Sequence, residues 1–395
     1  MNKFPVVILG GGESGRMFPL NTQHKALIEL AGQTLLERTI SNLLDANFSK
    51  IVVIINNQSN KELLLDKFGD KVTVLVQDNA TGMGEALLLA EDHLDDKFFV
   101  ISPYHFKSPE VLDKLAETKY DQAITVAETN IPQLYGIAEV DQDKALSIIE
   151  KPSPDQTNSN LRVVATYLLS RDFLTQLADT KKEQYSFETA LDAEMKAGRV
   201  GFATIDLELP SLKYAWHFFD HFKAIMTDQT THLSPQAEIS KTAIIDDSSG
   251  AVIVEDRARI GDFAKIVGPC YIGRDSLVGD YSFVRGSSIE SEVAVGAKTE
   301  VVRSIIFRGS SIHFGYIADS IVGSSTKIGA GLITANKRLD RDQIKVTIKN
   351  KPVETRRRAL GLICGEKSKI GIRVSTMPGT LIESNTTIFP SEELK

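Results

Sequence analysis

The sequence predicts two domains in succession, an α/β domain with a mostly parallel sheet over residues 1–230 and a parallel β-helix of hexapeptide repeats over residues 231–395. Over the first half, short apolar stretches alternate with stretches of helical spacing, which is typical of β-α-β units and a parallel sheet. From about Ser234 the helical spacing ends and an aliphatic residue recurs at every sixth position, as in repeats that coil into a parallel β-helix. We expect a short link at residues 227–235.

Length and composition indicate an ordinary globular protein. The chain has 395 residues, more than one small core can hold, with 42% hydrophobic and 25% charged residues. The formal net charge of −7 argues against general nucleic-acid binding. Two cysteines, Cys270 and Cys364, provide neither a disulfide framework nor a metal cluster, which favours a reducing compartment. With no recognisable signal peptide and no apolar stretch of about 20 residues, the expected location is the cytoplasm.

The first expected element is a buried strand at residues 6–9, VVIL, which stops at Gly10, Gly11 and Gly12. Because glycine has no Cβ, a ligand can approach the backbone N–H groups of such a turn. Arg16 and Lys25 follow as two cations. Bare backbone with cations nearby predicts a site for an anionic ligand, most simply a nucleoside triphosphate.

The following elements alternate between helix and strand. They are a helix at 35–44, a strand at 51–55, a helix at 61–68, a strand at 72–76, a helix at 84–94 and a strand at 98–101. In parallel sheets, ligands bind at the carboxyl ends of the strands, which is where the three glycines are expected.

The stretch from Leu9 to Lys25 resembles the beginning of the sugar-1-phosphate nucleotidylyltransferases (nucleotide-sugar pyrophosphorylases). That family has a strand followed by A-A/G-G-x-G-T-R-M, P-L and P-K. This chain has LGGGESGRM, PL and HK in the same order, and the departures are Ser14, Gly15 and His24. The resemblance implies that Leu9 and the three glycines bind the nucleotide, and that Arg16 and Lys25 act in catalysis.

Two later stretches resemble the same family. QDNATGMGEA at residues 77–86 is similar to Q-x-x-x-x-G-T-G/A-x-A, which implies that Gln77 and Gly82 hold the nucleotide base. YGI at 135–137 and IEKP at 149–152 are similar to Y-G and I-x-E-K-P, which implies that Gly136, Glu150 and Lys151 contact the sugar phosphate. Taken alone, these stretches would be a solvated Gln before a helix cap and an exposed strand end.

The metal site of that family is not matched. The resemblance implies Mg²⁺ as cofactor, held by an Asp at the end of the fourth strand and another in a late W-x-D. Tyr104 and Phe218 stand at those positions, and Val163 replaces a sugar-binding Asn. Tyr and Phe do not replace a hard oxygen ligand of Mg²⁺, which neutralises charge during phosphoryl transfer. Since only His105 or Asp220 offers a nearby alternative, we expect a site that binds nucleotide or sugar phosphate and turns over poorly or not at all.

Aliphatic residues set the hexapeptide period in the second half. The uninterrupted series is Val254, Ile260, Ile266, Ile272, Val278 and Val284. The period returns at Val322, Ile328, Ile370, Thr376, Ile382 and Ile388. Three hexads close one triangular coil, so these side chains are expected to point inward. The series is broken at 285–295 and around 335–360.

The second break is basic in a chain that is acidic overall. Its cations are Lys337, Arg338, Arg341, Lys345, Lys349, Lys351, Arg356, Arg357 and Arg358. A solvated loop explains this composition, and so does a site for the phosphates of coenzyme A, which Arg binds well. The sequence leaves both open.

Residues 299–378 resemble the left-handed β-helix acetyltransferase domain of bifunctional sugar-1-phosphate nucleotidylyltransferase/acetyltransferases of the archaeal type. The similarity is most visible in IHFGYIADS at 312–320, IGAGLITAN at 328–336 and IGIRVS at 370–375. It implies that His313 is the general base that deprotonates the attacking amine. By the same resemblance Arg285, Tyr316 and Asn336 hold the sugar phosphate, and Ala330 lines the acetyl-CoA site.

The resemblance also implies a homotrimer with acyl sites between neighbouring chains. Two positions depart from the family. Val302 stands where the family has a phosphate-binding Lys, and Lys327 where bacterial relatives have a substrate Asn. Arg303 is not counted as a replacement, because it is expected to face the other way in the strand.

Three functions fit these observations. The first is a bifunctional enzyme that takes a nucleoside triphosphate, a sugar-1-phosphate and acetyl-CoA to an activated sugar of the UDP-GlcNAc kind, with nucleotidyl transfer impaired. The second keeps only acetyl transfer in the β-helix. The third is a regulatory subunit that binds nucleotide or sugar phosphate beside an active paralogue. Acetyl-CoA turnover alone would favour the second, and binding without turnover the third.

Overall fold

Residue contacts divide the computed structural model, which describes residues 3–12, 14–78, 82–207 and 209–394, into two units. Unit 1 comprises Met1–Glu13 and Leu35–Leu209, and unit 2 comprises Ser14–Thr34 and Pro210–Lys395. The stretch after the three glycines therefore belongs to unit 2 by its contacts. The single domain boundary near residue 230 stays a prediction.

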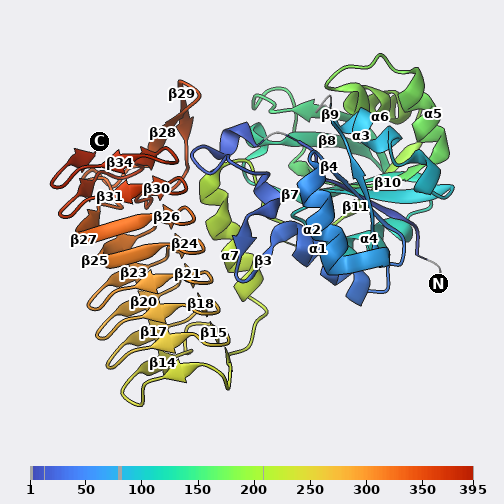
Figure 1. The fold of residues 1–395 in the computed structure, drawn as a ribbon. Helices are drawn as coiled ribbons and strands as arrows, with labels where there is room; N and C mark the ends of the chain where they lie inside the picture. The colour runs from blue at the N-terminus through green and yellow to red at the C-terminus, as the bar shows by residue number, and fades with distance from the viewer. Residues whose placement is uncertain (1–2, 13, 79–81, 208, 395) are drawn as a thin grey trace. The chain divides into compact units, whose positions relative to one another are not determined.

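A nine-stranded sheet with the order β5-β4-β1-β6-β10-β7-β11-β9-β8 forms the centre of unit 1 (Figure 1). Its strands are β1 (Val6–Leu9), β4 (Ile51–Ile55), β5 (Thr73–Val76), β6 (Lys97–Ile101), β7 (Gln122–Glu128), β8 (Gly136–Asp141), β9 (Lys144–Glu150), β10 (Leu161–Ser170) and β11 (Val200–Thr204). The pairs among β5, β4, β1 and β6 are parallel, as the alternation of helices and strands predicts. β10 is antiparallel to both β6 and β7, and β8 and β9 form an antiparallel hairpin.

Consecutive residues of β1, such as Val6, Val7 and Ile8, are all fully buried, which indicates that both faces of this sheet are covered. The helices are α1 (Leu35–Asp45), α2 (Gln58–Phe68), α3 (Met83–Leu88), α4 (Ser108–Ala116), α5 (Arg171–Asp179) and α6 (Ser186–Lys196). α3, α5 and α6 pack together and share one apolar core with the sheet, whereas α1 packs against α4. None of the described helices is long and apolar enough to cross a lipid bilayer.

Unit 2 begins with two 3-10 turns, Gly15–Met17 and Lys25–Leu27, and a hairpin of β2 (Glu29–Leu30) and β3 (Gln33–Thr34). The two loop residues of the hairpin, Ala31 and Gly32, have φ angles of 50° and 80°, as a type I′ turn requires. Residues of unit 2 that follow unit 1 in the chain form a 3-10 turn, Ala215–His217, and α7 (Phe218–Met226).

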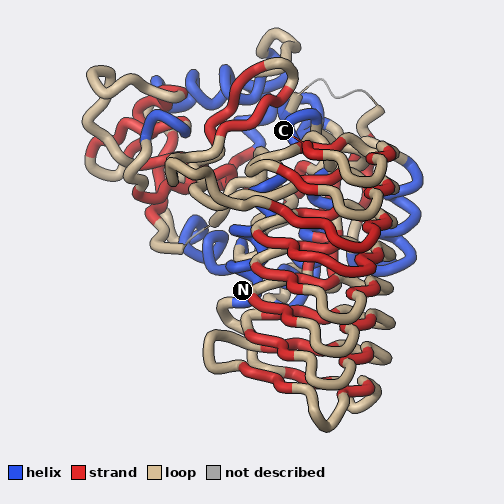
Figure 2. Tube along the Cα trace, turned by 90° about the vertical axis from the view of Figure 1, so that its left-hand side faces the viewer, coloured by secondary structure: helices blue, strands red, loops and turns tan. Residues whose placement is uncertain are grey.

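The rest of unit 2 is a left-handed parallel β-helix, in which short strands stack coil upon coil (Figure 2). One face has the order β12-β15-β18-β21-β24-β26-β30-β33, and the other two faces are joined in a 14-stranded sheet. The strands of the first face are β12 (His232–Leu233), β15 (Val252–Val254), β18 (Cys270–Ile272), β21 (Ser288–Ile289), β24 (Ile305–Ile306), β26 (Ile321–Val322), β30 (Ile363–Cys364) and β33 (Leu381–Ile382). The strands of the joined faces are β13 (Glu238–Ile239), β14 (Ile244–Asp246), β16 (Arg259–Ile260), β17 (Lys265–Val267), β19 (Leu277–Val278), β20 (Phe283–Arg285), β22 (Ala294–Val295), β23 (Glu300–Val302), β25 (Ser311–Ala318), β27 (Lys327–Thr334), β31 (Lys369–Ile370), β32 (Ser375–Thr376), β34 (Thr387–Ile388) and β35 (Glu393–Leu394).

The inward positions follow the sequence period. The six residues of the uninterrupted series are at most 2% exposed and lie in one core cluster. The period of six is broken at 285–295, as expected, but the coils continue, because Ile289 stacks on Ile272 and Val295 stacks on Val278 in register. Val284 and Ile289 are both buried although one corner between them is a residue short of a hexad. A corner can therefore lose a residue while the strands on both sides keep their ladder.

The basic stretch around 335–360 is an insertion between coils. It contains an antiparallel hairpin, β28 (Lys345–Ile348) and β29 (Lys351–Glu354). On either side of it, β26 pairs with β30, so that Ile321 stands opposite Ile363. The β-helix therefore resumes in register after the insertion.

Candidate functional site

The three glycines lie at the carboxyl end of β1, beside the ends of β4 and β5. The N–H of Gly10 donates to the carbonyl of Ile54 at 2.7 Å, and a Cβ at this position would lie 3.0 Å from the same oxygen. A Cβ at Gly11 would lie 3.0 Å from Oε1 of Gln77, which directly follows β5. The structure thus brings together Gly11 and Gln77, two positions that the sequence predicts to bind one nucleotide.

The neighbours of these residues are placed as follows. Leu9 ends β1 and is partly buried, whereas Gly12 is exposed with open space where a Cβ would be. Gly82 precedes α3 with a φ of 126°, and a Cβ there would lie 2.5 Å from the carbonyl oxygen of Gln184. Only glycine tolerates that conformation and that approach. The backbone conformation and the packing at position 82 are therefore enough to require glycine there, without a bound nucleotide. Residues 79–81 of the same stretch lie outside the described residues.

The β8–β9 hairpin brings together the three residues predicted to contact the sugar phosphate. Gly136 pairs with Glu150, and a Cβ at Gly136 would lie 3.1 Å from Oε2 of that Glu. The N–H of Lys151 donates to the carbonyl of Tyr135 at 2.9 Å. The Lys151 ammonium is 3.8 Å from Oε1 of Glu150, and both side chains are exposed. An exposed pair of this kind is weak, so it does not hold Lys151 away from a phosphate.

The end of β6, where the family has its first metal ligand, carries aromatic side chains. The ring of Tyr104 stands edge-on to that of His105, with centroids 4.9 Å apart. His105 is buried, and its Nδ1 lies 3.3 Å from Oγ1 of Thr166. Burial, Glu188 and Tyr104 together hold the pKa of the Tyr167 phenol well above its usual range. Neither Tyr104 nor the buried His105 offers an open carboxylate here.

The second metal position lies in unit 2 and is also closed. Phe218 is fully buried and packs on Phe307, with ring centroids 5.8 Å apart. The carboxylate of Asp220 accepts a hydrogen bond of 2.6 Å from Nη2 of Arg357. Within the part of the chain that the structure describes, no group of three or more His, Cys, Asp and Glu side chains could hold a metal ion. The residues at the family's metal positions therefore do not fit Mg²⁺.

Arg16 and Lys25 belong to a group of cations within unit 2. The Lys25 ammonium donates to the carbonyl of Leu212 at 2.8 Å, and its backbone N–H donates to Oγ of Ser14 at 2.9 Å. Burial, and then the charges of Arg16 and Lys213, lower the pKa of Lys25 to about 8. Lys213 is a member of this group that the sequence analysis missed, because nothing in its neighbourhood along the chain resembles a motif.

The hairpin of the basic insertion adds a further cation. A Cβ at Gly15 would lie 2.6 Å from Nζ of Lys349, which stands exposed between β28 and β29. Burial is the main cause that lowers the pKa of His24 to about 4 and that of His217 to about 3, so both are neutral at pH 7. The positive charge of this group therefore comes from Arg16, Lys25, Lys213 and Lys349, hereafter the cation group, and it suits a phosphate-bearing anion.

The residues predicted for acetyl transfer lie where β25 passes from one face of the β-helix to the next. β25 pairs with β22 at Ser311 and Ile312, and with β23 from Tyr316 onward. His313 and Phe314 are exposed between these two parts of the strand. Phe314 stands opposite Ala330 on β27. His313 and Ala330 therefore lie on neighbouring strands where β25 turns, hereafter the β25–β27 corner, and Tyr316 follows on β25 opposite Ile333.

Arg285 lies on the same sheet but farther down the stack. It stands opposite Val302, which in turn stands opposite Ala318. Its guanidinium is exposed and lies 5.9 Å from the ring centre of Phe283. Val302 is 2% exposed and has no polar group to offer a phosphate. Arg285 is thus separated from β25 by one coil.

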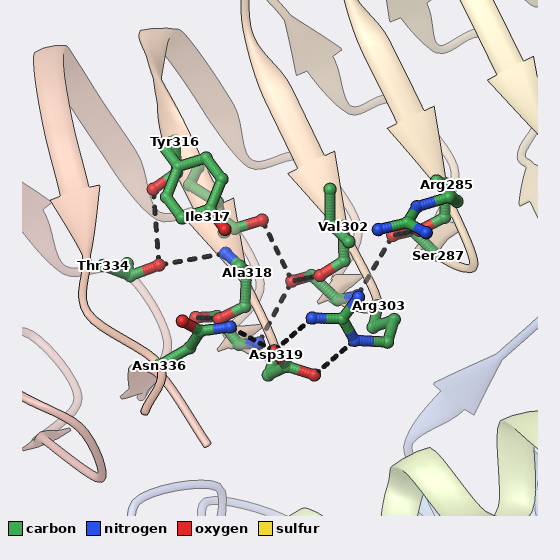
Figure 3. A network of polar contacts seen from close by, with 12 residues as sticks. Arg285, Ser287, Val302, Arg303, Tyr316, Ile317, Ala318, Asp319, Thr334 and Asn336 are labelled. Atoms are coloured by element: carbon green, nitrogen blue, oxygen red, sulfur yellow. Dashed lines mark hydrogen bonds and ion pairs between the residues drawn. The ribbon is translucent and has the colours of Figure 1, made fainter. Parts of the chain in front are cut away.

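Asn336 follows β27 and is held by a polar network (Figure 3). Its Nδ2 donates to Oδ2 of Asp319 at 2.5 Å. Arg303 donates to the same carboxylate twice, Nε to Oδ1 and Nη2 to Oδ2, both at 2.7 Å. β23 ends at Val302, and Arg303 turns the corner with a φ of 47°, so the strand alternation expected for Arg303 does not apply. The sequence could not reveal this network, because its members come from three successive coils.

Comparison with known proteins agrees with both halves of the structure. A family model described as nucleotidyl transferase matches residues 5–208. The chain is 30% identical to "Bifunctional protein GlmU" of Methanocaldococcus jannaschii over 394 residues, which cover 98% of this chain and 93% of that protein. It is 30% identical to "Bifunctional protein GlmU" of Methanococcus maripaludis strain S2 over 399 residues, with coverages of 97% and 92%.

The chain is also similar to a third relative and to one solved structure. The "Bifunctional sugar-1-phosphate nucleotidylyltransferase/acetyltransferase" of Sulfurisphaera tokodaii is 29% identical over 390 residues, with coverages of 97% and 95%. A crystal structure of a putative glucose-1-phosphate thymidylyltransferase from Bacillus anthracis, in complex with a sucrose, has a TM-score of 0.50 and 19% identity. It covers 58% of this chain and 97% of its own chain, and at this identity the likeness concerns the fold alone.

Proposed function

Because the chain belongs to the nucleotidyl transferase family and to its bifunctional nucleotidylyltransferase/acetyltransferase members, we propose that it is a transferase of nucleotide-sugar biosynthesis. Acetyl transfer takes place at the β25–β27 corner, and the nucleotide binds at the glycine stretch after β1. The observation that supports the proposal is the placement of His313 and Tyr316 on β25, beside the paired strand β27 that carries Ala330. The relatives match over nearly their whole length, so both halves of their printed names apply to this proposal.

The substrates of acetyl transfer are an amino-sugar-1-phosphate and acetyl-CoA. The sugar amine attacks the thioester carbonyl, so that an N–C bond forms, the C–S bond breaks and CoA leaves as a thiolate that takes up a proton. His313 is exposed on β25 and accepts the proton that the amine loses. Ala330, opposite Phe314, leaves room beside the corner for the thioester, and Tyr316 offers its hydroxyl to the sugar phosphate.

The nucleotide half is proposed to bind a nucleoside triphosphate and a sugar-1-phosphate. Gly10, Gly11 and Gln77 provide backbone and amide groups for the nucleotide, and the β8–β9 hairpin provides Lys151 for the sugar phosphate. Within unit 2, the cation group offers positive charge to a phosphate-bearing anion. Because Tyr104 and Phe218 do not fit Mg²⁺, no metal-assisted step is assigned, and we expect nucleotidyl transfer to be slow or absent.

Complete loss of nucleotidyl transfer lies within this proposal; it would leave an acetyltransferase with a nucleotide-binding domain, which the unmatched metal positions favour. One alternative differs from the proposal. A regulatory subunit without turnover, partnering an active paralogue, is not favoured by the full-length relatives, whose names state enzymatic activities. A homotrimer through the β-helix is part of the proposal, and a solution mass equal to one chain of 43.4 kDa would contradict it.

A paired assay on the purified protein tests the proposal. One arm follows thiol release from acetyl-CoA with glucosamine-1-phosphate. The other follows pyrophosphate release from UTP or dTTP with sugar-1-phosphates, with and without Mg²⁺. Thiol release with little or no pyrophosphate supports the proposal in full. Robust Mg²⁺-dependent pyrophosphate release would contradict the account of the metal positions, and silence in both arms would contradict the proposal as a whole.

A further inference from the structure

Asp319 joins two side chains that the proposed reaction does not connect. Its carboxylate is 10% exposed and accepts three hydrogen bonds, two from Arg303 and one from Asn336. Figure 3 shows Arg303 and Asn336 approaching this carboxylate from opposite sides. The Arg303 side chain is 45% exposed, so it is the Asp319 carboxylate that is largely removed from water, and charge-assisted hydrogen bonds to such a carboxylate are firmer than those of a fully exposed pair.

The ionised carboxylate decides how the amide of Asn336 is turned. A carboxylate only accepts hydrogen bonds, whereas an Asn amide carries a donor on Nδ2 and an acceptor on Oδ1. With Nδ2 donating to Asp319 at 2.5 Å, Oδ1 must point away from the carboxylate. Asn336 then offers an acceptor to a ligand that carries a donor, such as a hydroxyl or amino group of an amino sugar.

A second ion pair in the β-helix has the same two-bond geometry without a link, among the described residues, to a predicted site residue, so it serves as a matched comparison. Arg257 donates to Asp275 of the next coil in the same two-bond manner, Nε to Oδ1 at 2.6 Å and Nη2 to Oδ2 at 2.7 Å. All four residues of the two pairs turn corners with positive φ, from 47° to 58°. Asp275 is 39% exposed, and no Asn is among its hydrogen-bond partners in the described chain. Only the pair at Arg303 is coupled to a residue of the proposed site.

We propose that Arg303 is a positioning residue for acetyl transfer, which through Asp319 fixes the amide of Asn336 so that its carbonyl oxygen reads a donor group of the amino sugar. This inference rests on the proposed acetyl transfer. In this proposal Arg303 acts through Asp319 and is assigned no contact with the substrate. Its role differs from that of the family's phosphate-binding Lys, whose position is taken by the buried Val302.

Steady-state kinetics of thiol release test this role. Arg303→Ala removes the two hydrogen bonds that hold the Asp319 carboxylate in place, so the carboxylate and the Asn336 amide bonded to it can shift, and we expect the KM for glucosamine-1-phosphate to rise by about tenfold, the equivalent of about 1.4 kcal/mol. The KM for acetyl-CoA stays within about twofold, because the pair does not touch Ala330. Arg303→Lys restores one charged donor, so its KM for glucosamine-1-phosphate is expected to lie between those of the unchanged protein and of Arg303→Ala. Arg257→Ala, which removes the matching pair, changes neither KM.

A result in which Arg303→Ala and Arg257→Ala have the same KM for glucosamine-1-phosphate overturns the inference, and so does an equal rise in both KM values of Arg303→Ala. These readouts separate positioning from a general loss of stability, because the two Arg variants lose the same kind of ion pair.

A thermal-unfolding cycle tests the coupling without any turnover. We compare the melting temperatures of Arg303→Ala, Asn336→Ala and the double variant with the corresponding set for Arg257→Ala. The losses are expected to be less than additive for Arg303 with Asn336, since both act through one carboxylate, and additive for Arg257 with Asn336. Additive losses for the first pair overturn the inference. Failure of the proposed function would instead appear as no thiol release by the unchanged protein, while the cycle still reports on the coupling.

Discussion

Lys25 is a cation that a moderate rise in pH removes. Burial, followed by the charges of Arg16 and Lys213, lowers its pKa to about 8. Above that pH the unliganded protein loses one positive charge from the cation group, so we expect the affinity for dTTP to fall by up to about tenfold per pH unit. Isothermal calorimetry with dTTP at pH 7, 8 and 9 measures this dependence.

The matched variant is Lys25→Arg, because an Arg side chain stays protonated throughout this range. Its affinity for dTTP is expected to change little between pH 7 and 9, whatever its absolute value. Parallel pH curves for the unchanged protein and Lys25→Arg would show that another group controls the dependence.

Lys349 gives a second prediction at the scale of one side chain. Its ammonium lies beside Gly15, whereas Lys351 is on the same hairpin, also exposed, and forms part of β29. Removing one exposed charge from an anion site costs about 1 kcal/mol or less, so Lys349→Ala is expected to weaken dTTP binding about fivefold at low salt. Lys351→Ala is the control and is expected to bind as the unchanged protein does.

The salt dependence completes this test. The deficit of Lys349→Ala should shrink as NaCl is raised from 50 to 500 mM, because salt screens exposed charges. Equal affinities of the Lys349 and Lys351 variants at low salt would remove the hairpin from the cation group.

The roles of individual site residues were the least predictable feature from the sequence. Gln77 was found because it stands in a stretch that resembles a family motif, and the structure places it against Gly11. Lys213, Lys349 and Asp319 act through neighbours far away along the chain. No local pattern could assign them a role, since each owes it to packing within unit 2.

The β2–β3 hairpin is bonded within unit 2 to a buried acid of the β-helix. Glu290 is fully buried and accepts from the N–H groups of Ala31 at 2.8 Å and Gly32 at 3.1 Å, and from Oγ of Ser288 at 2.5 Å. Burial is the main cause that raises its pKa to about 7. The hairpin and the β-helix are thus tied by a carboxyl group that titrates near neutrality.

Stability should reflect this titration. Between about pH 4.5 and 7 the folded chain holds a proton on Glu290 that the unfolded chain has released, so this residue makes the free energy of unfolding fall as pH rises across that window. A shift from 4.5 to about 7 corresponds to about 3 kcal/mol. Urea unfolding of the unchanged protein and of Glu290→Gln, from pH 4.5 to 8, measures the contribution as a difference between the two curves.

The contribution of Glu290 is measured as a difference between the two proteins, because other groups change the free energy of unfolding with pH in the opposite direction. His24 and His217 have lowered pKa values, so they make stability rise with pH between about 4 and 6.5 in both proteins. Glu292→Gln is the control, since Glu292 is exposed and pairs with Arg308. A constant difference between the unchanged protein and Glu290→Gln at every pH would contradict this account of the element.

Among the elements, the β-helix was predicted more fully than its interruptions. The inward aliphatic period is a local property, so it is visible in the sequence and confirmed by the buried ladder. The corner after Val284 is one residue short, so the aliphatic residues no longer fall at every sixth position. The strands on both sides still pair in register, which a search for a period of six cannot detect. The hairpin β28–β29 was read as part of a basic loop, since its alternation of charged and apolar residues is only four residues long on each side.

At the scale of the molecule, the order of the two architectures was predictable and the division of contacts was not. Strand and helix periods placed the α/β half before the β-helix, and the family model and relatives agree. The segment Ser14–Thr34, however, belongs to unit 2 by its contacts although a motif joins it to the glycines of unit 1. Such packing depends on long-range partners, such as Glu290 for Gly32, that no period along the chain encodes.

Acetyl transfer at the β25–β27 corner is the central proposal, and the most direct measurement is thiol release from acetyl-CoA with glucosamine-1-phosphate by His313→Ala. Without a general base the rate should fall by about 10² to 10⁴-fold. His232→Ala is the matched control, because His232 is exposed on β12 of the same unit and lies outside the corner, and it should keep the full rate. Unchanged thiol release by His313→Ala would contradict the assignment of the reaction to this corner.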